Sequence, residues 1–379
     1  MTEIASTTTR AASAIEAARR VTIKIGSSLL IDSDGARHNW LVGVGDDIAA
    51  LRAAGKQVVL VSSGAVALGR EHLGLKRSNR LDHKQAAAAA GQALLMQAWE
   101  RALLPHGIPT AQLLLTLDDT EQRQRALNAR ATLDVLLGAG GLPVINENDS
   151  VATDELRYGD NDRLSARVAQ LVQSDVLILL SDVDGLFTAD PSRDAGATLI
   201  DFVPVVTDAI EAAAGGSGVG GVGTGGMRTK LQAARIASGV GCATIIASGH
   251  GERPLARLRD GGRATFVAAS GSPGRAYKSW IAGTIAPGGT VMIDAGAVSA
   301  LRAGKSLLPG GVVAVEGGFE RGACLRVLAG DGREVARGIA AYSAVEARLI
   351  CGHGSARIAE KLGYAGPDEL IHRNDLVML

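Results

Sequence analysis

The sequence predicts an α/β protein in which helices sandwich an open, mainly parallel sheet, followed by a small C-terminal domain resembling a β-barrel. Short runs rich in β-branched and aliphatic residues recur, and several are almost wholly apolar, as expected for strands buried on both faces of a parallel sheet. Alanine-rich segments of helical length separate these runs, and such alternation is typical of α/β folds. After residue 285 the apolar runs are short and broken by glycine, which indicates a second domain.

The expected elements follow in chain order. Strands of the first domain are predicted at residues 21–25, 57–61, 142–145, 176–180 and 243–247. The helical segments between them are 40–54, 84–104, 121–137, 162–173 and 229–238. The C-terminal domain is expected to contain strands at 290–293, 311–316, 323–329 and 334–339, with short helices at 343–350 and 355–362.

A chain of 379 residues is long enough for two domains. We expect a flexible N-terminal tail over residues 1–19, because no apolar run follows its arginines to make a signal peptide. The first domain then covers 20–267 and the second covers 287–379. Between them, residues 268–286 form a linker in which Gly271, Ser272, Pro273 and Gly274 cluster.

Composition excludes several classes of protein. Lys plus Arg and Asp plus Glu number 39 each, so no net charge draws the chain to nucleic acid or anionic membrane. Cys242, Cys324 and Cys351 lack the spacing of a zinc site and the density of a disulfide scaffold, which favours reduced thiols. No apolar stretch reaches the length of a membrane-spanning helix, which predicts a soluble, cytoplasmic protein.

Two polar motifs directly follow predicted strands near the N-terminus. Lys24 lies within a buried strand that opens into Gly26 and two serines, and a buried lysine needs an anion. The alternative is a lysine that extends to solvent from an edge strand. Ser62, Ser63 and Gly64 follow the next strand, where hydroxyl and amide groups suit a carboxylate or phosphate. Ordinary N-capping by serine is the alternative there.

Acidic and amide residues follow the next two strands. The stretch 146–150 reads Asn-Glu-Asn-Asp-Ser and is followed about a dozen residues later by 160–162, Asp-Asn-Asp. Acids placed there can bind Mg²⁺, hold a substrate ammonium or orient lysines, although 160–162 is also compatible with a helix cap. The segment 181–191 carries Ser181 and Asp182 at a strand end and suits the rim of a nucleotide site, or a simple turn.

The glycine-rich segment 223–230 precedes a predicted helix and ends at Lys230. Glycines allow close approach to phosphates, and the helix start offers free N–H groups. The spacing is not that of a Walker A loop, and the G-x-G-x-x-G at 221–226 lacks a preceding strand, so a dinucleotide site is not expected. A flexible linker is the alternative. Together, two lysines and three acidic or amide clusters at the strand ends of one sheet indicate phosphoryl transfer.

These stretches, in this order, resemble the amino-acid kinase superfamily, and the tail from about residue 287 resembles a PUA domain. The closest resemblance is to the branch that phosphorylates the γ-carboxylate of L-glutamate with ATP, the first step of proline biosynthesis. It implies that Lys24 and Lys230 stabilise the transferred phosphate and that Asp162 positions the lysines. It assigns glutamate binding to Ser63, Asp149 and Asn161. It assigns the ATP site to Lys24, Ser181, Asp182, Thr224, Gly225, Gly226, Met227, Arg228, Thr229 and Lys230.

The resemblance also implies ATP and Mg²⁺ as cofactors, with direct metal ligands left unassigned, proline as a feedback inhibitor and a homo-oligomer. Related kinases act on aspartate, acetylglutamate, carbamate or UMP, and fold physics alone does not choose among these acceptors. An alternative of a different functional class is an RNA-binding protein with a vestigial kinase domain, which the C-terminal domain suggests. Its basic residues are dispersed among acids and lack stacking aromatics, so we do not expect RNA binding.

Overall fold

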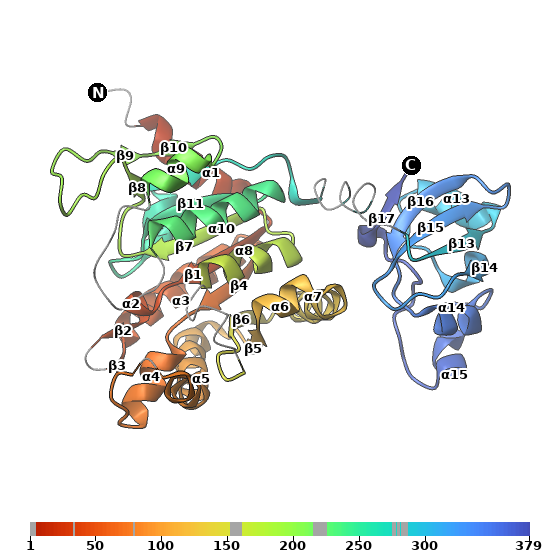
Figure 1. Cartoon of the computed structure of the whole chain (residues 1–379), viewed down its shortest axis with the longest axis horizontal. Helices are drawn as coiled ribbons and strands as arrows, with labels where there is room; N and C mark the ends of the chain where they lie inside the picture. The colour runs from red at the N-terminus through yellow and green to blue at the C-terminus, as the bar shows by residue number, and fades with distance from the viewer. Residues whose placement is uncertain are drawn as a thin grey trace. The chain divides into compact units, whose positions relative to one another are not determined.

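The computed structural model divides into two compact units, Met1–Pro273 and Gly274–Leu379 (Figure 1). It describes residues 5–32, 35–78, 80–151, 161–214, 226–274, 278, 281 and 287–379. Most of the predicted linker, together with residues 152–160 and 215–225, therefore lies outside the described residues.

Unit 1 is built on an eight-stranded sheet with the strand order β10-β12-β11-β7-β1-β4-β6-β5. From β11 to β5 each strand pairs in parallel with its neighbour, and β12 is antiparallel to β11. The open, mainly parallel sheet is confirmed. The strands are β1 Arg20–Ile25, β4 Gln57–Ser62, β5 Thr110–Leu115, β6 Leu142–Glu147, β7 Val176–Ser181, β10 Phe202–Val203, β11 Ala243–Ser248 and β12 Ala264–Val267.

Helices cover both faces of this sheet. Successive residues of a strand point to opposite faces, and in the central strands both sets of side chains are apolar. Leu60 belongs to a core that contains side chains of α1, α3, α5 and α11, whereas Val59 and Val61 belong to a core with α7 and α8. On that second face, Leu177 and Leu179 pack with α8 and α10. These helices are α1 Ala5–Ala17, α3 His38–Ala53, α5 Leu81–Leu103, α7 Arg123–Gly138, α8 Asn161–Leu171, α10 Met227–Gly239 and α11 Pro254–Arg259.

Each strand and helix predicted for the first domain has a counterpart in unit 1, but short and edge elements were missed. Strand β5 lies at the sheet edge and is only partly buried, so its apolar pattern is weak. The other additions are α2 Ser27–Leu30, α4 Ala65–His72, α6 Leu117–Glu121, α9 Asp208–Ala213, a 3-10 turn at Leu104–His106, and the hairpins β2 Ile31–Asp32 with β3 Gly35–Ala36 and β8 Leu186–Phe187 with β9 Leu199–Ile200.

The structure corrects the expectation of a flexible tail over residues 1–19. Helix α1 occupies most of that segment, and Ala11 and Ile15 on it are buried in the core. Lys56 anchors the end of the helix, because its ammonium group donates to the carbonyl oxygens of Glu16 at 2.6 Å and Ala18 at 3.1 Å. Buried Ala11 and Ile15 show that the described part of this segment packs on the domain.

Unit 2 contains a five-stranded mixed sheet with the order β14-β13-β15-β16-β17. Its own core gathers side chains such as Val291, Leu325 and Tyr342, so it buries apolar surface independently of unit 1. The strands are β13 Gly289–Ile293, β14 Val312–Glu316, β15 Cys324–Ala329, β16 Glu334–Ile339 and β17 Leu376–Met378. The helices are α13 Ala295–Arg302, α14 Ala344–Ile350 and α15 Ile358–Leu362, with 3-10 turns at Pro309–Gly311, Ser355–Arg357 and Arg373–Asp375.

None of the helices within the described ranges is long and apolar enough to cross a bilayer. Cys242 and Cys324 are buried and Cys351 is half-buried, and these three described residues form no disulfide with one another. Burial raises the pKa of the Cys242 thiol, so this side chain acts as a small apolar group in the core.

Helices α4 and α5 approach so closely that glycine is required where their backbones meet. A Cβ atom on Gly91 would lie 1.8 Å from the carbonyl oxygen of Ala65, and one on Gly69 would lie 1.8 Å from that of Ala87. We predict that Gly91→Ala lowers the free energy of unfolding by at least about 2 kcal/mol, because a backbone must move to accept the methyl group. Urea denaturation of the purified protein measures this.

Gly138→Ala is the matched control, because a Cβ there meets nothing within 4 Å. It should be neutral or slightly stabilising, since alanine has the higher helix propensity. Equal stability of the Gly91→Ala variant and the parent protein would contradict the close approach of α4 and α5.

Candidate active site

The polar motifs singled out in the sequence gather at one edge of the sheet of unit 1. Strands β1, β4, β6, β7 and β11 run parallel, so the residues that follow them emerge at the same edge. Gly26 follows β1, Ser63 follows β4, Asn148 follows β6 and Asp182 follows β7. Segments far apart in the sequence therefore share one site.

At this edge a buried carboxylate lies between two buried lysines. Lys24 Nζ is 2.6 Å from Asp162 Oδ1, and Lys230 Nζ is 3.3 Å from Asp162 Oδ2. The three residues are 6%, 1% and 5% exposed for Lys24, Asp162 and Lys230 respectively. They come from three elements: β1 supplies Lys24, the first turn of α8 supplies Asp162 and the first turn of α10 supplies Lys230.

The charges of this cluster are strongly coupled. Burial by itself would raise the pKa of Asp162, but the ammonium groups of Lys24 and Lys230 outweigh it and bring that pKa down to about 2. Asp162 is therefore ionised at neutral pH. These three side chains together carry one excess positive charge in a nearly water-free position, which is a favourable environment for an anion such as phosphate.

Thr229 gives Asp162 a further partner. Its hydroxyl lies 2.7 Å from Asp162 Oδ2, and it also lies 2.8 Å from the carbonyl oxygen of Gly226 at the start of α10. The sequence assigned Thr229 only to the nucleotide site. In the structure it links the first turn of α10 to the carboxylate that holds both lysines.

An amide network adjoins this cluster. Asn161 Nδ2 donates to Ser63 Oγ at 2.7 Å and to Asn146 Oδ1 at 3.0 Å. Asn161 Oδ1 is buried and has no hydrogen-bond partner among the residues that the structure describes. A buried acceptor without a partner costs free energy, which indicates that a ligand donor belongs there. Asn146 lies in the polar motif after β6 but was not among the predicted site residues.

Asp149 is only 8% exposed, and burial raises the pKa of its carboxyl group to about 6. It follows β6 by two residues, at the same sheet edge as Ser63. A carboxylate that is poorly solvated when ionised gains from a cationic partner, and a substrate ammonium group is one such partner.

The predicted nucleotide residues are only partly described. Ser181 is buried at the end of β7 and donates from its hydroxyl to Asp182 Oδ1 at 2.9 Å, while Asp182 itself is exposed. Arg228 is exposed and lies 3.8 Å from Glu211. Met227 is half-buried in the first turn of α10, and Gly226 precedes that turn. Thr224 and Gly225 lie outside the described residues.

No group of three or more His, Cys, Asp or Glu side chains that could hold a metal occurs in the described ranges. Mg²⁺ in phosphoryl-transfer sites is commonly held by one or two carboxylates together with the phosphates of the nucleotide. The exposed Asp182 at the sheet edge is compatible with such an arrangement. The donor set therefore fits an ion that arrives with the nucleotide.

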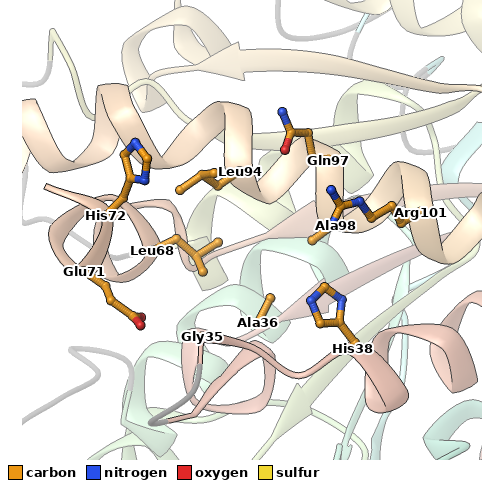
Figure 2. Close-up of a pocket in the computed structure, with 10 residues that line it drawn as sticks. All are labelled: Gly35, Ala36, His38, Leu68, Glu71, His72, Leu94, Gln97, Ala98 and Arg101. Carbon is orange, nitrogen blue, oxygen red and sulfur yellow. The ribbon is translucent and has the colours of Figure 1, made fainter.

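A separate hollow of about 250 Å³ lies between the β2–β3 hairpin and helices α4 and α5 (Figure 2). Its lining includes Leu68 and the polar residues His38, Glu71, His72, Gln97 and Arg101. These polar side chains are exposed, and none of the predicted site residues that the structure describes is among its lining. The hollow is not part of the site at the strand ends.

Comparison with known proteins identifies the family of this chain. The amino acid kinase family matches residues 19–248, and the PUA domain matches residues 289–362. The chain therefore belongs to the amino acid kinase family, with a PUA domain after the kinase domain. Within that family it groups with the proteins named glutamate 5-kinase, several of which are more than half identical to it over nearly their whole length.

Three of these relatives show the extent of the similarity. Glutamate 5-kinase of Caulobacter vibrioides is 56% identical, over 96% of this chain and 98% of the relative. Glutamate 5-kinase 1 of Rhizobium meliloti is 54% identical, over 98% of this chain and 94% of the relative. Glutamate 5-kinase of Paramagnetospirillum magneticum is 53% identical, over 97% of this chain and 99% of the relative.

The charge cluster predicts a large effect on stability when its carboxylate is removed. Asp162→Asn leaves two buried ammonium groups around a neutral amide, so we expect a loss of about 3–5 kcal/mol at neutral pH. Because the pKa of Asp162 is lowered from 3.8 to about 2, its contribution is present above pH 4 and disappears as the pH falls towards 2. Urea denaturation at pH 7 and at pH 3 measures both effects.

Asp82→Asn is the control, because Asp82 forms an exposed ion pair with Arg80 away from the cluster. It should leave the denaturation midpoint unchanged at pH 7. The Asp162→Asn variant and the parent protein should differ less in their free energy of unfolding at pH 3 than at pH 7. An equal difference at both pH values would contradict the charge assigned to Asp162.

Proposed function

We propose that the chain transfers the γ-phosphoryl group of ATP to the side-chain carboxylate of L-glutamate, which makes L-glutamyl 5-phosphate for proline biosynthesis. The observation that carries the proposal is the buried Lys24–Asp162–Lys230 cluster at the carboxyl edge of the sheet. The high identity to proteins named glutamate 5-kinase supports the choice of acceptor. Such a phosphotransferase needs positioned positive charge more than covalent chemistry.

In this reaction a γ-carboxylate oxygen of glutamate attacks the γ-phosphorus of ATP in line with the bond to the β-phosphate. A carboxyl oxygen–phosphorus bond forms, the bond to the bridging oxygen breaks, and ADP leaves with that oxygen. The side chain of free glutamate is already ionised at neutral pH, so the attack needs no general base. Catalysis therefore consists of orientation and stabilisation of charge.

We assign the stabilisation of charge to the two lysines. Lys24 and Lys230 would lie against the phosphates and the transferring group, and Asp162 would hold both ammonium groups in place. Their burial strengthens each electrostatic interaction, since little water is present to screen it. Thr229 supports the same geometry through its contact with Asp162.

We assign glutamate binding to Ser63, Asp149 and Asn161. Asn161 Oδ1, which has no hydrogen-bond partner within the described ranges, suits a substrate N–H group, and the Asp149 carboxylate suits the α-ammonium group. Ser63 and Asn161 are already joined by a hydrogen bond, so the two would act as one preformed surface.

We assign the ATP rim to Lys24, Ser181, Asp182 and the segment 224–230. The first turn of α10 supports this, because Gly226 and the free N–H groups of a helix start suit phosphate. When bound with ATP, Mg²⁺ would neutralise part of the charge on the phosphates, and the exposed carboxylate of Asp182 would be available to hold it.

The direct test measures ADP release from MgATP by the purified protein with glutamate, aspartate, acetylglutamate, carbamate or UMP as acceptor. Turnover with glutamate alone is expected. Turnover with a different acceptor would overturn the substrate while keeping the phosphoryl-transfer chemistry. No turnover with any of them would overturn the proposed activity.

We predict that Lys230→Ala lowers kcat by about 10²- to 10³-fold, as removal of one preorganised charge typically does. Lys24→Ala should behave alike. Steady-state assays at saturating glutamate and ATP measure this loss.

Lys56→Ala is the matched control, because Lys56 is similarly buried and its partners among the described residues are backbone carbonyls at the end of α1. It should lower stability while keeping kcat. If Lys230→Ala turns over at the parent rate, the phosphate role is wrong.

The raised pKa of Asp149 predicts a pH dependence of glutamate binding. Its carboxylate is ionised above pH 6 and becomes protonated below it, so the KM for glutamate should rise about tenfold between pH 7.5 and pH 5. The KM for ATP should change much less. Initial rates across this range provide the measurement.

Asp149→Asn is the companion variant, because it removes the titrating group and keeps the size of the side chain. Its KM for glutamate should be high and nearly independent of pH. A variant that keeps the parent pH profile would show that another group titrates.

We further propose that proline, the end product of the pathway, inhibits the enzyme and that the chain acts as a homo-oligomer in the cytoplasm. Exposed apolar side chains on unit 1, such as Leu104 and Val135, support association between copies. RNA is not an expected partner, because Arg326 and Arg337 in unit 2 are paired with Glu334. Titration of the kinase activity with proline tests the inhibition. Light scattering of the protein as it elutes from a size-exclusion column tests the oligomeric state.

A further inference from the structure

Trp99 makes a polar contact in the core beside the proposed glutamate site. It lies on α5, is fully buried, and donates from its indole Nε1 to Ser62 Oγ at 2.9 Å. Ser62 is itself fully buried as the last residue of β4 and directly precedes Ser63. A buried indole N–H needs an acceptor, and here the acceptor lies next to a site residue.

Hydrogen bonds hold Ser63 from several sides. Its N–H donates to the carbonyl oxygen of Ile25 at 3.1 Å, and its hydroxyl accepts from Asn161 Nδ2 at 2.7 Å. Its carbonyl oxygen accepts from Ser62 Oγ at 3.2 Å. Ser62 therefore connects the indole of Trp99 to the backbone of Ser63.

The chain turns sharply directly after this point. Gly64 has a φ of 111°, in the region that favours glycine, and α4 begins at the next residue. At such a turn, a small change in the Ser63 peptide plane redirects the serine side chain. The hydrogen bond between Ser62 Oγ and Ser63 O lies at the peptide that leads into the turn.

We propose that Trp99 is a positioning residue for glutamate, acting through the hydroxyl of Ser62 on the orientation of Ser63. This rests on the proposed function, in which Ser63 binds glutamate. The indole N–H holds the Ser62 hydroxyl oxygen as an acceptor and leaves its proton directed at the Ser63 carbonyl. Without the indole N–H, the hydroxyl rotates more freely and Ser63 samples other orientations.

The effect should be specific to glutamate, because Ser63 lies after β4 whereas the proposed ATP rim, apart from Lys24 on β1, lies after β7 and at the start of α10. The experiment compares KM for glutamate, KM for ATP and kcat in Trp99→Phe, Ser62→Ala and the double variant. Trp99→Phe removes the N–H and keeps an aromatic ring. We expect it to raise the KM for glutamate about fivefold, the effect of one typical hydrogen bond, with kcat and the KM for ATP within twofold.

The double variant separates a hydrogen-bond role from simple packing. If Trp99 acts through Ser62, the double variant should have the same KM for glutamate as Ser62→Ala alone. Leu103→Ala, which opens a cavity at another fully buried position of α5, should lower the melting temperature without changing the KM for glutamate. Ser62→Ala removes little volume, so it tests the same hydrogen bond even if Trp99→Phe folds poorly.

An unchanged KM for glutamate in both Trp99→Phe and Ser62→Ala would overturn the inference. The inference would also be overturned if the effects of the two substitutions on the KM for glutamate were additive in the double variant. An equal rise of that KM in Leu103→Ala would overturn it as well. Ser63→Ala distinguishes a failure of the substrate role of Ser63 from a failure of the positioning role of Trp99. If it leaves the KM for glutamate unchanged, the proposed substrate role of Ser63 fails. If it raises that KM while Trp99→Phe does not, only the role of Trp99 fails.

Discussion

The ion cluster around Asp162 is the interaction on which the site depends, because it joins elements that the sequence keeps far apart. Moving ionised groups away from water is costly, and the cost is offset only when opposite charges meet at close range. Here one carboxylate meets Lys24 from β1 and Lys230 from α10 while itself standing at the start of α8. The packing of α8 and α10 on one face of the sheet is thereby tied to the position of the charges.

The other face of the sheet supports the site in a different way. Helices α4 and α5 meet through small residues, and Gly69 and Gly91 allow their backbones to touch. Because α4 begins immediately after Gly64, the position of this helix sets the direction in which the chain leaves the turn at Ser63 and Gly64. A tightly packed, nearly incompressible pair of helices is a rigid support for that turn.

Much of the fold is predictable from the sequence because parallel strands and their covering helices have distinct patterns. The runs that became β6, β7 and β11 are buried along their whole length, and continuous apolar sequence is the signal for such strands. Edge strands and short hairpins are harder to predict from the sequence, because their partial exposure permits polar residues that break the apolar pattern. Helix α1 was missed because its sequence is small and polar, and Ala11 and Ile15 are the side chains described as buried on it.

The sequence by itself determined the class of fold and the presence of lysines, acids and amides at strand ends, because periodicity and composition are local properties. It also marked Lys24, Asp162 and Lys230 as candidates, through the family resemblance that their motifs carry. Only the tertiary structure decided that both lysines meet one carboxylate and that Thr229 joins them. It also decided that Asn146 bonds to Asn161 and that Trp99 bonds to Ser62. Those contacts join residues that lie 15 to 138 positions apart. Their geometry arises from the packing of helices on the sheet, which no local pattern encodes.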